Sequence, residues 1–182
     1  MQTSSELITI KRDCEAILIP SGDPIKLIKG THVRITQALG GDYTLFVNGN
    51  LVKISGADAD VIGKDSEEEK IDVPKSTGEP VHEEQVWEQL RTVYDPEIPV
   101  NIVELGLVYD LQIKNKKKEY QVHVKMTLTA PGCGMGPVIA QDAEMKIRNI
   151  PSVKDVMVEI VWEPIWSREM MSDEAKLQLG MM

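Results

Sequence analysis

The stretch "EYQVHVKMTLTAPGCGMGP", residues 119–137, decides the fold of the second half of the chain. Apolar and polar side chains alternate from Tyr120 to Leu128, which predicts a strand with one face toward a core and Thr127 on the polar face. Pro137 suits the first turn of a helix, because its missing N–H would have no helical partner there. We therefore expect a strand that leads through a glycine-rich loop into a helix.

Four further segments complete this half. Apolar residues recur at helical spacing over residues 82–94 and 137–150, and they alternate with polar ones over 107–113 and 156–160. The resulting order of elements is α-β-β-α-β. Helices on one face of a small sheet predict a two-layer α+β domain.

The first half, residues 1–62, has a different pattern. Short apolar runs such as 16–19 alternate with turn signals, and Asn48-Gly49 is a strong signal for a two-residue hairpin. This pattern predicts a small all-β domain, either a barrel or an open sandwich. Cys14 lies between two acidic residues ahead of a strand, and we expect it to be a packed or idle thiol.

A charged segment separates the two halves. The stretch "GKDSEEEKIDVPKSTGEP", residues 63–80, is acidic and contains glycine and proline, so it cannot bury enough apolar surface to order itself. We predict a β-barrel-like domain at 1–62, an acidic linker at 63–80, and a second domain with a C-terminal tail at 81–182.

Composition excludes several classes of protein. The 182 residues carry a net charge of -9, whereas a general nucleic-acid binder needs clustered Lys and Arg. No apolar run approaches the roughly 20 residues that span a bilayer, and no signal-peptide pattern is present. Two cysteines far apart in sequence are no disulfide framework. We expect a cytoplasmic protein with reduced thiols that binds neither nucleic acid nor membrane.

The glycine-rich loop holds the second cysteine, Cys133, among Gly132, Gly134 and Gly136. A position ahead of a helix N-terminus stabilises negative charge and favours the thiolate, the form that binds metals and attacks electrophiles. Glycines also let the backbone approach a ligand closely. The alternative is a tight turn from strand to helix with an incidental thiol.

A second loop, "DPEIPVNIVELG" at residues 95–106, offers several polar side chains. Its two prolines end the preceding helix and favour an extended path. Asp95 either braces the turn, as aspartate before proline often does, or acts as a ligand. The same two alternatives apply to the other carboxylates of the loop.

Four motifs together resemble the PaaD-like metal–sulfur cluster assembly domain. The resemblance covers residues 82–182, and the first half is similar to that of bacterial SufT-type proteins. The motifs are "DPEIPVNIVELGLVYD" (95–110), "TLTAPGCGMG" (127–136), "WEPIW" (162–166) and "MSDEAKLQLG" (171–180). The resemblance implies an accessory factor in iron–sulfur cluster maturation. By position it implies that Cys133 is the central residue, with Asp95, Glu97, Asn101 and Thr129 as its companions.

Ligand counting limits the mechanism. Iron–sulfur clusters usually take four thiolates, and a closed zinc site takes four protein ligands. One suitable cysteine meets neither need, so any cluster is transient and shared with a second copy, a partner or a small thiol. Trp162 and Trp166 near the C-terminus are candidate partner-binding residues, because aromatic side chains are enriched at interfaces; alternatively they cover the sheet or the cysteine loop.

Three functions compete. The leading hypothesis is a carrier or maturation factor for iron–sulfur clusters, working with other assembly proteins, client apoproteins or a second copy of itself. The alternative is a metal-free adaptor that docks the assembly machinery onto clients. A thiol enzyme is disfavoured, since a nucleophile needs an adjacent base and none of the three histidines lies in a recognisable catalytic motif. We predict that the protein is not an enzyme.

Overall fold

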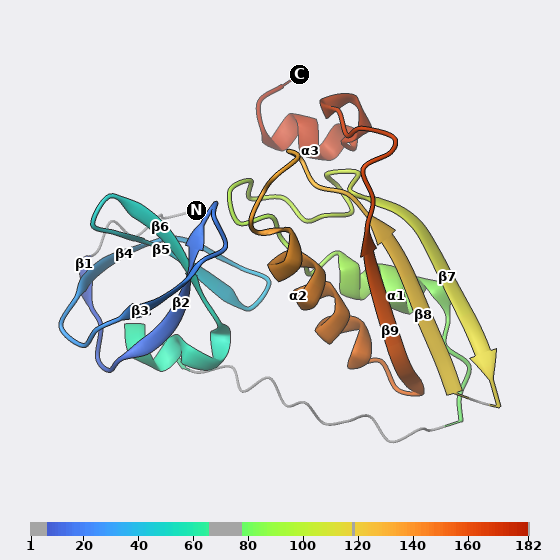
Figure 1. The fold of residues 1–182 in the computed structure, drawn as a ribbon, viewed down its shortest axis with the longest axis horizontal. Helices are drawn as coiled ribbons and strands as arrows, with labels where there is room; N and C mark the ends of the chain where they lie inside the picture. Colours follow the sequence, from blue (N-terminus) through green and yellow to red (C-terminus); the bar gives the residue numbers. More distant parts are fainter. Residues whose placement is uncertain (1–6, 66–77, 118, 182) are drawn as a thin grey trace. The chain divides into compact units, whose positions relative to one another are not determined.

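The computed structural model describes residues 7–65, 78–117 and 119–181 (Figure 1). The chain divides into two compact units, Met1–Lys70 and Ile71–Met182. The first contains a six-stranded sheet, and the second combines a three-stranded sheet with helices. The predicted mixed α+β class is therefore confirmed. Most of the predicted linker, residues 66–77, lies outside the described residues.

All strand pairs of the first unit are antiparallel, and their order is β1-β4-β5-β6-β2-β3. The strands and η1 enclose a cluster of buried apolar side chains that includes Cys14. Burial raises the pKa of the Cys14 thiol, as expected for a packed cysteine. The elements are β1 (Leu7–Thr9), β2 (Cys14–Ile19), β3 (Pro24–Leu27), β4 (His32–Leu39), β5 (Asp42–Val47), β6 (Asn50–Ile54) and the 3-10 helix η1 (Gly56–Ile62).

The predicted hairpin at Asn48-Gly49 joins β5 to β6. Both residues have positive φ, 48° and 85°, and Val47 pairs with Asn50 across the turn. Such a turn matches the right-handed twist of the flanking strands, and asparagine and glycine tolerate it best. The observed turn confirms the hairpin predicted from the sequence.

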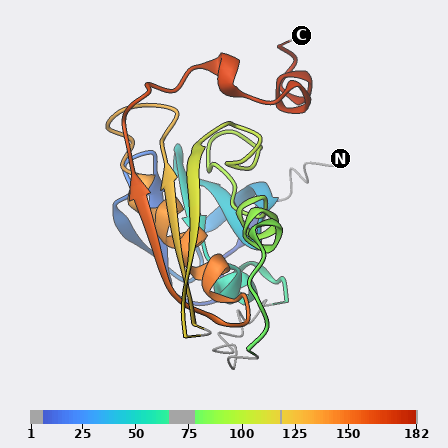
Figure 2. The same cartoon turned by 90° about the vertical axis from the view of Figure 1, so that its right-hand side faces the viewer.

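In the second unit, β8 pairs antiparallel with β7 and parallel with β9. Parallel strands need a long crossover, and α2 supplies it between β8 and β9. Figure 2 shows α1 and α2 on the same side of the sheet. The elements are α1 (Glu83–Leu90), β7 (Val108–Lys116), β8 (Glu119–Met126), α2 (Gly136–Arg148), β9 (Val153–Ile160), the 3-10 helix η2 (Arg168–Met170) and α3 (Asp173–Gln178).

The core of this unit lies between sheet and helices. The buried side chains follow the predicted periodicities: Val86 and Leu90 from α1, Val122, Val124 and Met126 from β8, and Ile139, Ala143 and Ile147 from α2. The helix predicted for 82–94 is shorter than expected and ends at Leu90, although Val93 beyond it remains buried. No helix in the described parts of the chain is long and apolar enough to cross a bilayer.

One prediction about β8 is wrong. Thr127 was expected on the polar face, but only 1% of its surface is exposed. The strand ends at Met126, so the two-residue alternation stops there. Instead the Thr127 N–H donates to the Leu107 carbonyl at 2.8 Å, which draws the residue inward at the start of the next loop.

Candidate functional site

The cysteine loop, residues 127–135, connects β8 to α2. Within it the Cys133 N–H donates to the Ala130 carbonyl at 3.4 Å, and the Cys133 carbonyl accepts from the Gly136 N–H at 3.2 Å. Gly132 has φ of +80°, a conformation that favours glycine. The thiol of Cys133 is half-buried and forms no disulfide. The turn therefore fixes the backbone of Cys133 while its sulfur remains partly accessible.

Gly136 fixes the loop against the first turn of α2. A Cβ atom built at this position would lie 2.6 Å from Cδ1 of Leu128 and 3.3 Å from Cδ1 of Ile160. Glycine at this position therefore allows Leu128, at the start of the cysteine loop, to lie close to the first turn of α2, and a larger residue would have to displace the leucine side chain.

Cys133 lies shortly before α2, which begins at Gly136. The helix has Met135 at its N-cap and proline in its first turn, and no side-chain hydrogen bond caps it within the described residues. The first N–H groups of a helix and its dipole favour negative charge nearby. The predicted placement of the cysteine ahead of a helix is confirmed.

The motif loop, residues 95–106, is braced by two polar side chains. Asp95 is 5% exposed, and its Oδ1 accepts the N–H groups of Glu97 and Ile98, each at 2.9 Å. Burial raises the pKa of Asp95, and these two hydrogen bonds oppose that rise. This geometry is the turn-bracing alternative foreseen for aspartate before proline.

Asn101 repeats the arrangement further along the motif loop. Its Oδ1 accepts the N–H groups of Val103 at 3.0 Å and Glu104 at 2.9 Å, and its backbone pairs with Tyr94. Glu97, in contrast, is exposed and forms no ion pair with any described residue. Of the three companion residues in this loop, two hold the backbone and one faces solvent.

The C-terminal tail, residues 161–181, lies on the motif loop. Trp166 Nε1 donates to the Leu105 carbonyl at 2.7 Å, and the Ser172 N–H donates to the Glu104 carbonyl at 2.9 Å. Gln178 Nε2 reaches the Pro99 carbonyl at 3.1 Å. The two side-chain hydrogen bonds join residues that are 61 positions apart (Trp166 and Leu105) and 79 positions apart (Gln178 and Pro99) in the sequence. The tail therefore holds the motif loop along most of its length.

Gly106 permits a close approach between the motif loop and the Met170 backbone of the tail. Its φ is +71°, and a Cβ atom there would collide with the Met170 carbonyl. Sequence reasoning missed this role of Gly106 and the contact of the tail with the motif loop. The one local sequence feature that pointed to a close backbone approach was the glycine at the end of the motif "DPEIPVNIVELG".

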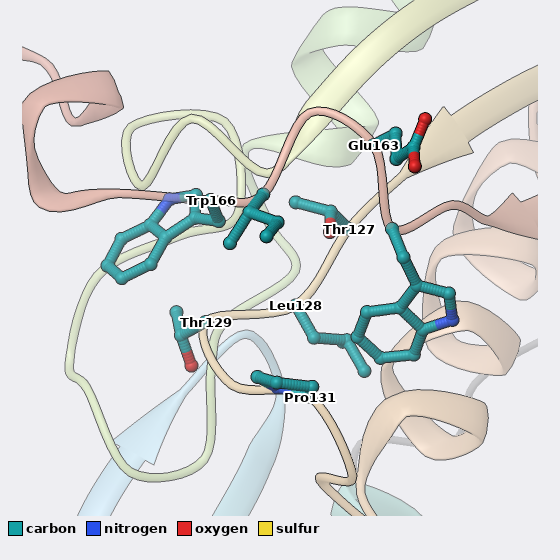
Figure 3. Close-up of a pocket in the computed structure, with 8 residues that line it drawn as sticks. Thr127, Leu128, Thr129, Pro131, Glu163 and Trp166 are labelled. Atoms are coloured by element: carbon teal, nitrogen blue, oxygen red, sulfur yellow. The ribbon is translucent and has the colours of Figure 1, made fainter.

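A pocket of about 330 Å³ lies between the cysteine loop and the tail (Figure 3). Leu128, Thr129 and Pro131 line it from the cysteine loop, and the tail contributes aromatic and aliphatic side chains. Trp162 is 46% exposed here, whereas the Trp166 indole N–H is already paired. The pocket brings Thr129 together with both tryptophans that sequence analysis singled out.

The donor set around Cys133 does not form a closed metal site. In the described ranges, no three His, Cys, Asp or Glu side chains gather closely enough to hold an ion. The second cysteine of the sequence, Cys14, is buried in the core of the other unit. Asp95 and Asn101 use an oxygen each on the backbone of the motif loop.

The sequence that forms this unit matches a class of iron–sulfur cluster assembly proteins. The family described as "Iron-sulfur cluster assembly protein" matches residues 83–160. A "Fe-S protein maturation auxiliary factor" of Porphyromonas gingivalis is 46% identical over 98 residues, which cover 54% of this chain and 90% of that one.

Two further relatives agree. The Bacillus subtilis "Fe-S protein maturation auxiliary factor YitW" is 42% identical, with 53% of this chain and 92% of that chain covered. The Staphylococcus aureus "Fe-S protein maturation auxiliary factor SufT" is 44% identical, with 48% and 97% covered. The chain belongs to the iron–sulfur cluster assembly protein family, and the resemblance found in its motifs is confirmed.

Proposed function

We propose that this protein is a non-enzymatic accessory factor in iron–sulfur cluster assembly that carries a cluster on Cys133 and delivers it to client apoproteins. The relatives named as maturation factors support the accessory role. One observation carries the role of Cys133: it is a half-accessible free thiol in a loop fixed at both ends, directly ahead of a helix N-terminus.

The cluster is cargo in this proposal. Thiolate is the ligand that selects iron–sulfur chemistry, and one thiolate cannot complete the coordination of a cluster. The remaining ligands come from a second copy of the chain, an assembly partner or a small thiol. Incomplete ligation suits a carrier, because the cluster has to leave as well as arrive.

Asp95, Asn101 and Thr129 support the site without binding the cluster directly. The first two fix the path of the motif loop through backbone hydrogen bonds. Thr129 lines the pocket beside the cysteine loop. The exposed carboxylate of Glu97 and the rings of Trp162 and Trp166 are left for contacts with partner proteins. The cytoplasm is the compartment for this role, since both cysteines are unpaired and thiols stay reduced there.

A metal-free adaptor is the second candidate. The pocket between the cysteine loop and the tail favours it, because an apolar cavity with an exposed tryptophan can dock a protein segment without any cluster. In that case Cys133 would pack in the loop or respond to redox state.

Anaerobic reconstitution with iron and sulfide separates the two candidates. We expect the parent protein to bind iron and sulfide and to show thiolate-to-iron absorption, with a second copy or an added thiol completing the site. The Cys133→Ser variant should bind neither, whereas Cys14→Ala should behave like the parent. Light scattering on the same samples gives the number of chains. A strict monomer that holds a stable cluster without added thiol contradicts the carrier proposal, and so does a parent that binds no iron.

A further inference from the structure

The pocket beside the cysteine loop has an apolar interior that opens to solvent. Its lining includes Leu128 and Pro131 from the cysteine loop (Figure 3). The tail contributes Trp162, Ile165 and Trp166. Its volume of about 330 Å³ is at the lower end of the range for small ligand sites, roughly 300–1,000 Å³. A space of this size suits one or two amino-acid side chains better than a large cofactor.

The rim of the pocket is unusually apolar for an exposed surface. Ile165 is 79% exposed and Trp162 is 46% exposed, and both belong to the short segment after β9. The tail is not loose at this point, because the Trp166 indole donates to the Leu105 carbonyl and the Tyr109 hydroxyl donates to the Pro164 carbonyl at 2.8 Å. The exposed side chains are therefore held in place, as in interfaces that are preformed before binding.

One carboxylate, that of Glu163, lines the pocket. The motif loop, which the tail contacts, carries two further carboxylates, Glu97 and Glu104. None of these three carboxylates forms an ion pair with a residue in the described parts of the chain. The tail itself contains four acidic residues, Glu163, Glu169, Asp173 and Glu174, and two basic ones, Arg168 and Lys176.

The acidic character of the tail limits which molecule can dock in the pocket. A second copy of the chain carries a net charge of -9, so its docking here would be opposed by repulsion. A segment in which an apolar side chain is flanked by arginine or lysine would fill the cavity and pair with Glu163 and the acidic tail beside it. We propose that the pocket is the docking site for a basic, apolar peptide segment of a partner protein, which deepens the partner binding contained in the proposed function and rests on it.

The test uses three fluorescein-labelled peptides and fluorescence anisotropy. The first has the centre Arg-Leu-Trp-Arg, the second has glutamate in place of both arginines, and the third has alanine in place of Leu-Trp. We expect the first to bind, the other two to bind about tenfold more weakly or worse, and added salt to weaken the first. Equal binding of the acidic peptide, equal binding of the alanine peptide, or no binding of the first peptide overturns the proposal.

Substitutions in the tail test whether the peptide binds at the pocket. Ile165→Ser and Glu163→Lys should each weaken the first peptide about fivefold or more. The matched controls are Met157→Ser, at a side chain 62% exposed on β9, and Glu88→Lys, at an exposed position on α1; both should bind like the parent. Equal losses in the controls would overturn the proposal, since the effect would then be one of overall charge or apolarity.

A further variant keeps this proposal distinct from the carrier role. Cys133→Ser should bind the first peptide like the parent, because the sulfur does not line the pocket. If peptide binding fails while Cys133 still proves necessary for cluster binding, the docking proposal falls alone. Self-association that is abolished by Ile165→Ser would assign the pocket to a second copy and would also overturn it.

Discussion

At the residue scale, the polar side chains of the motif loop hold its backbone. Asp95 and Asn101 each place one oxygen on two consecutive N–H groups. Asp95 does so while 5% exposed, and its burial favours the neutral acid. The residue therefore couples the stability of the loop to pH, which gives a test of whether it acts as a brace.

We predict that Asp95→Asn removes a pH dependence of stability. The pKa of Asp95 is raised in the folded state, so that state binds the proton more tightly than the unfolded state does. Ionisation of Asp95 then costs stability as pH rises from the unfolded pKa of about 3.9 through the folded pKa. The unfolding free energy of the variant minus that of the parent should rise over this window and then level off, as measured by denaturant titration at several pH values.

The control for this comparison is Asp95→Ala. Asparagine keeps Oδ1 as an acceptor, whereas alanine leaves the N–H groups of Glu97 and Ile98 unpaired, which costs about 1–3 kcal/mol. A difference between asparagine variant and parent that stays flat with pH would mean that burial does not control this carboxyl group.

At the element scale, contacts between residues far apart in the sequence fix the positions of the loops. These long-range contacts could not be predicted from the sequence. The strand β8 and the hairpin at Asn48-Gly49 were predictable because side-chain alternation and turn chemistry are local. Thr127 was misplaced because the alternation was extended past the last strand residue. The tail lies on the motif loop through a Trp166 bond to Leu105, and nothing near Trp166 in sequence indicates that partner.

We predict that Gly106→Ala destabilises the protein more than Gly132→Ala does. Both glycines have positive φ, and an alanine in that conformation costs about 1–2 kcal/mol. At Gly132 the added Cβ meets open space, whereas at Gly106 it meets the Met170 backbone and forces the tail away. Denaturant unfolding measures the two costs, and tryptophan emission should shift to longer wavelength only in Gly106→Ala. Equal costs and unchanged emission would contradict the close contact between tail and motif loop.

At the scale of the whole molecule, the chain consists of two compact units with different architectures. The cysteines are divided between them: Cys14 lies in a β core, and Cys133 lies in the accessible loop of the unit that matches the family. The sequence shows a similar contrast, since one half alternates like strands and the other mixes helical and strand periods. The domain division at residues 1–62, 63–80 and 81–182 stays a prediction.

We predict that limited proteolysis cuts first between residues 63 and 80. The described ends of this segment, 63–65 and 78–80, are exposed, and its composition is acidic with glycine and proline. Mass spectrometry should find two resistant fragments close to 1–62 and 81–182. A first cut inside α2, with the segment 63–80 still intact, would contradict the proposed linker.

The most direct test of the carrier role is the activity of an iron–sulfur enzyme in cells that lack the native protein and express a variant instead. The free energy of unfolding of Cys133→Ser should lie within about 0.5 kcal/mol of that of the parent, because a half-exposed loop residue contributes little packing. The variant should nevertheless fail to restore the enzyme, since serine is a poor ligand for iron–sulfur chemistry. Cys14→Ala should restore it. Full restoration by Cys133→Ser would contradict the carrier proposal and favour the adaptor, and a Cys133→Ser protein that no longer folds would show that the thiol is structural.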